Sequence, residues 1–451
     1  MQFRIRGQRM CALLVGFFLL AALPAAAAVK NVERGTAQQS TQAARASQAA
    51  QASASQAAQA AQPTSALVRW QPYAGAVRYV ARILRKAPDG KMTTVFTKDY
   101  IYTTGVYLSL VGYGAAEDLY WTVQPLDYYG KPIASASDPH PLATEESAAK
   151  APVLTTEFDR MPYALLYPVY SWIPLPGQKH HEVEIYRRTG STDVYVHTLR
   201  GGEYDAYDDM AFRTPGHYVF RVRGLTAAGA PASDWSDYRS FDVVDRAPIA
   251  AFGDSITHGG GAISLPPSYL LYNWETYCNI PVKNLGHSGD TTGDMLARFD
   301  QDVLPFAPRV LIIMGGVNDF RTGIYGAQSV RNLTALRDKC KAYGITPIFL
   351  TATPIHPALM TSRLNIAAPP ADWWEHRDYI NNWIMQQEYS IDVATVISNA
   401  NGELEEAYTT DGLHPDFVAK RYIGQMVESY LRMYFAYAAG EAARRAPVKA
   451  S

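Results

Sequence analysis

The sequence Ile249-Ala250-Ala251-Phe252-Gly253-Asp254-Ser255-Ile256-Thr257 carries an apolar run into a short polar turn. A short apolar run that ends in a glycine indicates a strand buried on both faces. In a parallel sheet covered by helices, ligand sites lie just beyond the carboxyl ends of the strands. We therefore expect Asp254 and Ser255 to lie at a functional site.

Three more polar clusters occupy comparable places further along the chain. They are Asn284-Leu285-Gly286-His287-Ser288-Gly289-Asp290, Gly315-Gly316-Val317-Asn318-Asp319 and Asp411-Gly412-Leu413-His414-Pro415. The first two follow apolar runs, and the last stands before the final helical stretch. Clusters that repeatedly fall where the sheet topology places a site are a stronger signal than any one of them.

The pattern around these clusters alternates between strands and helices. Strands are expected near 249–252, 282–285, 310–314, 347–351 and 391–394. Helices are expected near 295–301, 327–343, 373–388 and 415–437. Such alternation predicts a three-layer α/β domain with a parallel sheet, which we place at residues 246–437.

Together the four clusters resemble the sequence blocks of SGNH (GDSL-like) hydrolases, namely Gly-Asp-Ser, a block-two glycine, Gly-x-Asn-Asp and Asp-x-x-His. The resemblance covers residues 247–437, and Ile256 stands where the family name has leucine. It implies a flavodoxin-like fold and a carboxylic ester hydrolase that uses a serine nucleophile. It implies neither a cofactor nor a metal, and no metal motif of credible spacing occurs in the sequence.

Ser255 and His414 are the candidate nucleophile and base. A serine hydroxyl is a weak nucleophile until a neighbouring base takes its proton, and an imidazole titrates in the right range to do so. Asp411 lies three positions before His414 and can orient its ring and stabilise the imidazolium. The alternative is that Ser255 caps a helix and that Asp411 and His414 belong to a surface turn.

The same resemblance implies three donors for an oxyanion, which are the backbone N–H of Ser255, the backbone N–H of Gly286 and the side-chain amide of Asn318. Such donors must already point at the place where negative charge develops. Asp254, Asn284 and Asp319 lie in the same clusters and are expected to support these loops rather than react.

Other residues of the α/β region remain open between several interpretations. His258 and His287 are plain loop histidines, substrate contacts or metal ligands. Trp373 and Trp374 lie on a long insertion and either line the cleft or anchor the following helix. Cys278 and Cys340 are too few for a disulfide framework, and their pairing stays open.

The first residues predict an exported protein. Basic residues at 4, 6 and 9 precede an apolar run at 11–23, and an alanine stretch follows up to residue 28. These are the three parts of a signal peptide, which we place at 1–28; the alternative is an uncleaved anchor. The run is short for a bilayer, so no transmembrane span is expected after signal removal. An Ala/Gln/Ser-rich linker at 29–63 follows, and the protein would be periplasmic, cell-surface or extracellular.

Two all-β modules are expected between the linker and the α/β domain, at 64–146 and 150–245. Both carry short alternating strands, and Trp70-Gln71-Pro72 is echoed by Trp172-Ile173-Pro174. They resemble fibronectin type III modules and serve either as spacers or as carbohydrate- or protein-binding units. A polar tail at 438–451 ends the chain.

The organisation favours an exported serine esterase that deacetylates a carbohydrate or cell-envelope substrate, such as an acetylated polysaccharide or peptidoglycan. A lipase, lysophospholipase, thioesterase or acyltransferase of the same family is the alternative within enzymes. A non-catalytic surface adhesin or scaffold is the alternative from another class. The formal net charge of −1 gives no electrostatic reason to expect nucleic acid as a partner.

Overall fold

The computed structural model describes residues 65–73, 75–113, 116–142, 150–260 and 269–445. All of them belong to one unit of the chain, Gln62–Ser451. The predicted signal peptide and linker, and the end of the predicted tail, lie outside the described residues. Within the described part, none of the helices combines the length and apolarity that crossing a bilayer requires.

The first β-domain consists of two antiparallel sheets, with strand orders β1-β4 and β3-β2-β5-β6. Its strands are β1 (Ser65–Arg69), β2 (Arg78–Lys86), β3 (Met92–Ile101), β4 (Gly105–Ser109), β5 (Leu119–Leu126) and β6 (His140–Pro141). Alternate residues of β2, among them Tyr79 and Ile83, point inward and meet Val68 and Leu108 of the other sheet in one core. The two sheets therefore pack face to face.

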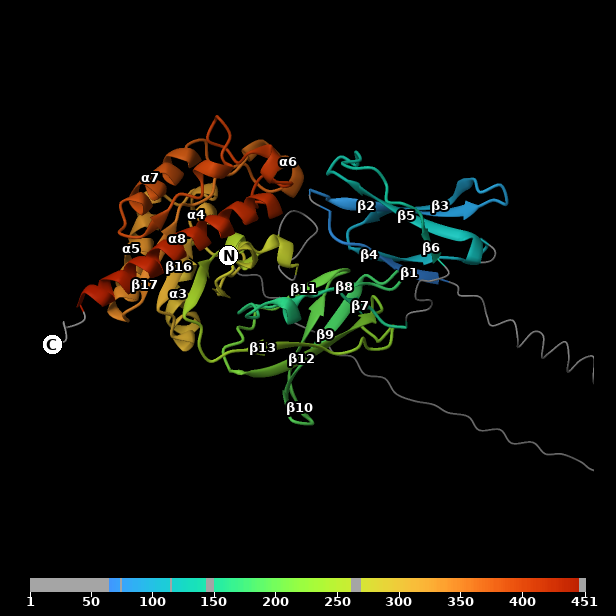
Figure 1. The fold of residues 1–451 in the computed structure, drawn as a ribbon, viewed down its shortest axis with the longest axis horizontal. Helices are drawn as coiled ribbons and strands as arrows, with labels where there is room; N and C mark the ends of the chain where they lie inside the picture. The colour runs from blue at the N-terminus through green and yellow to red at the C-terminus, as the bar shows by residue number, and fades with distance from the viewer. Residues whose placement is uncertain (1–64, 74, 114–115, 143–149, 261–268, 446–451) are drawn as a thin grey trace, which may run out of the picture. The chain divides into compact units, whose positions relative to one another are not determined.

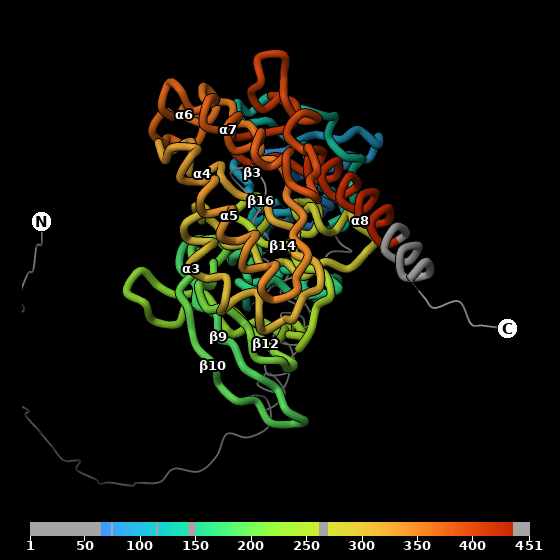
Figure 2. Tube along the Cα trace, turned by 90° about the vertical axis from the view of Figure 1, so that its left-hand side faces the viewer, coloured from blue at the N-terminus to red at the C-terminus, as the bar shows by residue number. Residues whose placement is uncertain are grey.

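The second β-domain repeats this plan, with sheets β11-β8-β7 and β10-β9-β12-β13. Its strands are β7 (Val153–Leu154), β8 (Val169–Ile173), β9 (His180–Thr189), β10 (Thr192–Gly201), β11 (Asp205–Tyr207), β12 (Gly216–Leu225) and β13 (Arg239–Val243). Figure 2 shows β9 and β10 as a long hairpin. The prediction of sheet-rich N-terminal modules is confirmed, whereas their fibronectin type III identity stays a prediction.

A five-stranded parallel sheet of order β15-β14-β16-β17-β18 forms the centre of the α/β domain. The strands are β14 (Ile249–Gly253), β15 (Lys283–Asn284), β16 (Val310–Met314), β17 (Thr346–Leu350) and β18 (Ser390–Ile391). Strands β14 and β16 are buried along their whole length, as expected for parallel strands covered on both faces. The predicted parallel sheet is confirmed.

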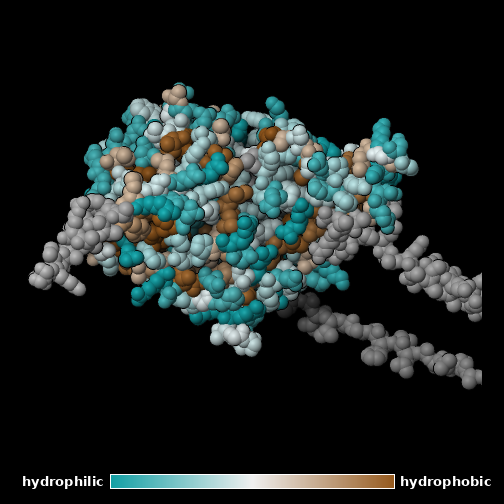
Figure 3. All heavy atoms as spheres, in the orientation of Figure 1, coloured by the Kyte–Doolittle hydropathy of each residue, from teal (hydrophilic) through white to brown (hydrophobic). Residues whose placement is uncertain are grey.

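The helices that surround this sheet are α2 (Ser255–His258), α3 (Thr292–Asp302), α4 (Val317–Arg321), α5 (Gly326–Ala342), α6 (Pro357–Leu364), α7 (Trp373–Met385) and α8 (Phe417–Arg445). Helix α6 was not expected from the sequence. It begins with a proline at its first position, and the His356 side chain accepts a hydrogen bond from the Leu359 amide at its N-terminus. The face of the molecule drawn in Figure 3 is largely hydrophilic, with small apolar patches.

The second β-domain and the α/β domain share one continuous hydrophobic cluster, which runs from Phe220 and Leu166 to Phe252 and Phe306. Polar contacts cross the same boundary: the Lys283 ammonium donates to the carbonyl of Ala164 at 2.6 Å. The amide of Leu166 also donates to the carbonyl of Asn284 at 3.1 Å. The segment before β8 is therefore fastened to β15, which leads directly into one of the polar clusters.

Candidate active site

Ser255 follows β14 and is the first residue of the short helix α2. The Asp254 side chain accepts a hydrogen bond from the Ile256 amide at 2.9 Å and so caps this helix. On the far side, the ammonium of buried Lys420 in α8 donates to the Ile256 carbonyl at 2.6 Å. The turn that carries Ser255 is therefore held from both ends, and sequence patterns gave no sign of the Lys420 contact.

The structure brings Ser255, His414 and Asp411 together, although 159 positions separate the serine from the histidine. The His414 Nε2 atom lies 3.0 Å from the Ser255 Oγ atom. The His414 Nδ1 atom lies 2.8 Å from the Asp411 Oδ2 atom. With Nδ1 donating to the carboxylate, the Nε2 atom is left as an acceptor for the serine proton.

Asp411 is almost completely buried, yet it remains suited to the ionised state. Burial acts to raise the pKa of its carboxyl, but the charge and hydrogen bonds of His414 outweigh this and hold the pKa below its ordinary value. The backbone amides of Leu413 and His414 also donate to Asp411 Oδ1, at 2.8 and 2.7 Å. These bonds leave Oδ2 free for the imidazole.

Asn318 lies in α4, close to the end of β16, and its amide is fixed by two neighbours. Its Nδ2 atom donates to the Asp290 carbonyl at 2.8 Å, and its Oδ1 atom accepts from Arg321 Nε at 2.8 Å. An amide nitrogen carries two hydrogens, so one of them remains available beside Ser255. The Arg321 contact sets which end of the amide is the donor.

The structure does not support the predicted role of Gly286 as an oxyanion donor. Its N–H donates to the Asn284 side chain at 2.9 Å, and a Cβ atom there would lie 2.2 Å from the His258 amide nitrogen. Gly286 therefore serves close packing of two loops. Gly289, three residues later, lines the cavity with Ser255 and has a φ of +91°, which favours glycine. Both glycines occur in the same cluster, so the sequence alone did not separate them.

Asn284 and Asp319, predicted to support the site, connect the loops through side-chain hydrogen bonds. Asn284 donates to the Thr257 carbonyl at 2.6 Å and thereby joins β15 to α2. Asp319 accepts from the Thr292 amide at 2.9 Å and from the Ser329 hydroxyl at 2.8 Å, which joins α4 to α3 and α5. Burial raises the pKa of Asp254 to about 7.

A cavity of about 420 Å³ opens at these residues. The described residues that line it are Tyr207, Ser255, Gly259, Gly260, Ser288, Gly289, Asn318, Arg321, Leu413 and His414. Small polar groups predominate among them, with Leu413 as the one aliphatic side chain in this described set. Tyr207 comes from β11 of the second β-domain, a contribution that the sequence did not predict.

Residues 251–416 match the model of the GDSL-like Lipase/Acylhydrolase family. The C-terminal part of the chain is a GDSL-like acylhydrolase domain. Domains of this family hydrolyse ester bonds, which agrees with the class of enzyme predicted from the four clusters. The match covers the acylhydrolase domain and leaves the two β-domains without a family assignment.

The individual proteins that this chain resembles share low sequence identity with it or match only a part of it. The uncharacterized lipoprotein YqeF of Bacillus subtilis is 33% identical over 118 residues, which make up 24% of this chain and 49% of that protein. The chain thus spans about half the length of this curated relative. A lipase/acylhydrolase from Enterococcus faecalis has 23% identity and a TM-score of 0.34, covering 41% of this chain and 95% of that one. An acetylxylan esterase from Geobacillus stearothermophilus has 20% identity and a TM-score of 0.31, covering 40% and 92%.

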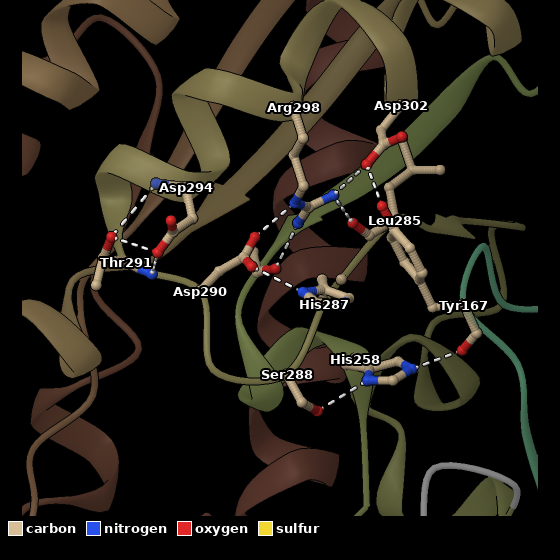
Figure 4. Close-up of polar contacts among 12 residues, drawn as sticks. Tyr167, His258, Leu285, His287, Ser288, Asp290, Thr291, Asp294, Arg298 and Asp302 are labelled. Carbon is tan, nitrogen blue, oxygen red and sulfur yellow. Dashed lines mark hydrogen bonds and ion pairs between the residues drawn. The ribbon is translucent and has the colours of Figure 1, made fainter. Parts of the chain in front are cut away.

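The two histidines near the site make structural contacts, one of them to the second β-domain. His258 is buried, with Nδ1 2.8 Å from the Ser288 hydroxyl and Nε2 2.7 Å from the Tyr167 carbonyl (Figure 4). A carbonyl only accepts, so Nε2 carries the proton and Nδ1 accepts from Ser288. Burial lowers the pKa of His258 to about 4, which keeps the ring neutral. His287 bonds Asp290 at 2.8 Å, and neither ring is among the described cavity-lining residues.

Arg298 is a structural hub of the acylhydrolase domain, a role for which the local sequence has no signature. Figure 4 shows its guanidinium between the carboxylates of Asp290 and Asp302. It also donates to the carbonyls of Gly253 at 3.0 Å and Leu285 at 2.8 Å. These carbonyls end β14 and follow β15, so Arg298 fixes the spacing between the loops that carry Ser255 and Gly289.

The structure also shows the surroundings of the tryptophans and cysteines whose roles the sequence left undecided. Trp373 is buried, and its ring centroid lies 5.7 Å from that of Phe320, so it anchors α7; Trp374 is half exposed. Cys278 and Cys340 are both buried and free. Among the described residues, no three His, Cys, Asp or Glu side chains gather as the ligands of a metal would.

Proposed function

We propose that this chain is an exported esterase that removes short acyl groups from a carbohydrate or cell-envelope substrate through an acyl-enzyme on Ser255. The observation that carries the proposal is the hydrogen-bonded series from Asp411 through His414 to Ser255, with distances of 2.8 and 3.0 Å, at the edge of a cavity. This is the arrangement that activates a serine hydroxyl.

In the proposed reaction, Ser255 Oγ attacks the ester carbonyl while its proton moves to His414 Nε2. The carbonyl oxygen becomes negative and is stabilised by the backbone N–H groups of Ser255 and Gly289 and by the second Nδ2 hydrogen of Asn318. His414 then gives its proton to the leaving alcohol. Water, deprotonated by the same imidazole, attacks the acyl-serine and releases the acid and the free Ser255.

The lining of the cavity supports a polar substrate rather than a lipid. An acyl chain of a phospholipid needs a long apolar surface, whereas the described lining holds one aliphatic side chain, Leu413. A short acyl group fits the small residues beside Ser255, and a sugar fits hydroxyl, amide and aromatic groups. Export is supported by the signal-like N-terminus and by the lipoprotein relative in Bacillus subtilis.

Hydrolysis of aryl acetate by the purified chain tests the proposal. We expect turnover by the parent and a loss of about 10⁴-fold or more in kcat for Ser255→Ala, because the nucleophile is removed. Ser362→Ala, which alters an exposed serine on α6, is the matched control. A fluorophosphonate should label the parent and the control but not Ser255→Ala. Equal labelling of all three would contradict the assignment.

A series of aryl esters separates the acetyl esterase from a lipid esterase. We expect kcat/KM to be highest for acetate and to fall as the acyl chain lengthens, since the cavity is small and its described lining holds one aliphatic side chain, Leu413. A maximum at eight or more carbons would favour the lipase or thioesterase alternative. Turnover that increases on adding a second alcohol, with the ester of that alcohol as product, would favour acyl transfer.

A further inference from the structure

Arg321 is the one cationic side chain among the described residues that line the cavity. It ends α4, three positions after Asn318, and its Nε atom donates to the Asn318 Oδ1 atom. The side-chain hydrogen bond that Arg321 makes among the described residues goes to the Asn318 amide, and the carboxylate whose charge acts on it is that of Asp254. The terminal nitrogens of this side chain thus retain donors that the described protein does not use.

The environment of Arg321 makes an unpaired charge costly. The side chain is about half buried, and burial lowers the pKa of its guanidinium, while the charge of Asp254 acts in the opposite direction. A guanidinium stays protonated even so, because its pKa remains far above neutrality. A charge that is partly removed from water and lacks a partner is stabilised when an anion binds to it.

The neighbours of Arg321 place this charge beside the reacting ester. Asn318, to which it is bonded, lines the same cavity as Ser255 and His414. Arg321 is therefore separated from the proposed oxyanion by a single amide group. A guanidinium recognises carboxylates and phosphates through paired, directional hydrogen bonds, which fits an anionic group carried by the substrate itself.

Tyr207 supplies a second feature of the cavity, from a different domain. Its side chain remains half exposed and lines the cavity, with its ring centroid 6.2 Å from that of buried His258. An exposed tyrosine held in place by a sheet offers a flat apolar face and a polar edge, which suit a sugar ring. The cavity thus combines an aromatic face, a fixed cation and the serine.

We infer that the substrate is an acylated anionic sugar, whose carboxylate or phosphate binds Arg321 while its ring lies against Tyr207. The inference rests on the proposed esterase function and narrows its substrate class. The acyl group would be attached to a hydroxyl near the anionic substituent, since Arg321 and Ser255 share one small cavity. A neutral acetylated sugar would leave the guanidinium without a partner.

Kinetics with three soluble esters test the inference: O-acetyl glucose, O-acetyl glucuronate and O-acetyl glucose 6-phosphate. We expect the parent to favour at least one anionic ester over the neutral one by about tenfold or more in kcat/KM. Which anionic ester is favoured distinguishes a carboxylate from a phosphate. In Arg321→Gln the ratio should fall to near one, mainly through a higher KM. Arg331→Gln, which removes an exposed arginine on α5, is the matched control.

A purely structural role for Arg321, acting through Asn318, gives a different result. Arg321→Gln would then lower kcat for all three esters by the same factor and leave the ratio unchanged, which would overturn the inference. Equal kcat/KM for neutral and anionic esters in the parent would overturn it as well. Arg321→Lys keeps the charge and should retain part of the preference.

Binding to the inactive Ser255→Ala chain tests the inference without turnover. Calorimetry should show glucuronate or glucose 6-phosphate binding at least about tenfold more tightly than glucose, and Arg321→Gln in the same background should remove the difference. If the parent does not hydrolyse aryl acetate, the proposed esterase function is refuted. The calorimetry would still show whether Arg321 binds an anionic sugar. Equal binding of the three sugars would refute the anionic substrate.

Discussion

At the scale of single residues, the site depends on side chains that are buried and yet polar. His258 is held neutral by burial, because its Nδ1 accepts from Ser288 while its Nε2 donates to Tyr167. The ammonium groups of Lys283 and Lys420 donate hydrogen bonds to the backbone carbonyls of Ala164 and Ile256, respectively. Such groups form specific contacts at the cost of desolvation, so each of them links stability to pH.

The depressed pKa of His258 predicts a loss of stability in mild acid. In the unfolded chain the ring binds a proton near pH 6.5, but in the folded chain only near pH 4. The unfolded state therefore gains protons first, and the contribution of the neutral ring is lost as pH falls from about 6.5 towards 4. Over this window the free energy of unfolding of the parent should fall by about 3 kcal/mol relative to His258→Gln.

Urea unfolding of both chains at pH 7 and pH 5 should show about 2 kcal/mol of this difference, because pH 5 lies part-way through the window. His258→Gln serves as the reference for the parent. Asp254 and other buried groups titrate in both proteins, so their contributions to the free energy of unfolding cancel. A gap between parent and variant that stays constant from pH 7 to pH 5 would show that the ring is not held neutral in the fold.

At the scale of elements, short helices and turns are positioned by side-chain hydrogen bonds rather than by their own stability. Helix α4 has only five residues, too few to be stable alone. Asp319 connects it to Thr292 in α3 and Ser329 in α5. The placement of Asn318, one residue earlier, therefore depends on a carboxylate that never touches the cavity.

Asp319→Asn tests whether this carboxylate both stabilises the fold and positions Asn318. The change replaces a carboxylate oxygen by an amide nitrogen, so at least one of the three donors loses its acceptor. We expect the free energy of unfolding to fall by about 2–3 kcal/mol and kcat to fall with KM little changed, because Asn318 becomes less well placed. Thermal unfolding and aryl acetate kinetics measure both. Asp338→Asn, at an exposed site on α5, is the control.

At the scale of the whole molecule, the second β-domain forms part of the structural unit that holds the acylhydrolase domain. The Tyr167 carbonyl accepts a hydrogen bond from His258 Nε2, and the Tyr167 hydroxyl donates to Asp302 at 2.7 Å. Asp302 in turn accepts from Arg298, the hub of the loops that carry Ser255 and Gly289. A spacer would not make such contacts, so truncating this domain should affect the site directly.

Tyr167→Phe isolates the hydroxyl contact across the boundary. Asp302 keeps its bonds to Arg298 and Arg213, so we expect a loss of about 1–2 kcal/mol in the free energy of unfolding. Tyr170→Phe is the matched control, since its hydroxyl bonds Asp208 inside the second β-domain at a longer 3.3 Å. A smaller loss for Tyr167→Phe than for Tyr170→Phe would contradict the importance of the boundary contact.

The sequence by itself determined the strands of the parallel sheet and the polar clusters that follow them. An apolar run followed by a glycine and an acidic or amide residue is a local pattern, and the rule that places sites at strand ends needs only the order of the elements. Ser255 could be selected in this way, whereas Asp411 and His414 were selected by their three-residue spacing and by the family resemblance; the structure places all three within hydrogen-bond distance. Their roles remain proposals that the variants above test.

Only the tertiary structure decided which glycine lines the cavity and which domain completes it. Gly286 and Gly289 have the same chemistry in the sequence, and their difference lies in whether another backbone passes within contact distance. Tyr207, Tyr167 and Arg298 reach the site from segments with no local signature of function. The physical reason is that periodicity records which face of an element is buried, whereas contacts between distant segments depend on how whole layers pack.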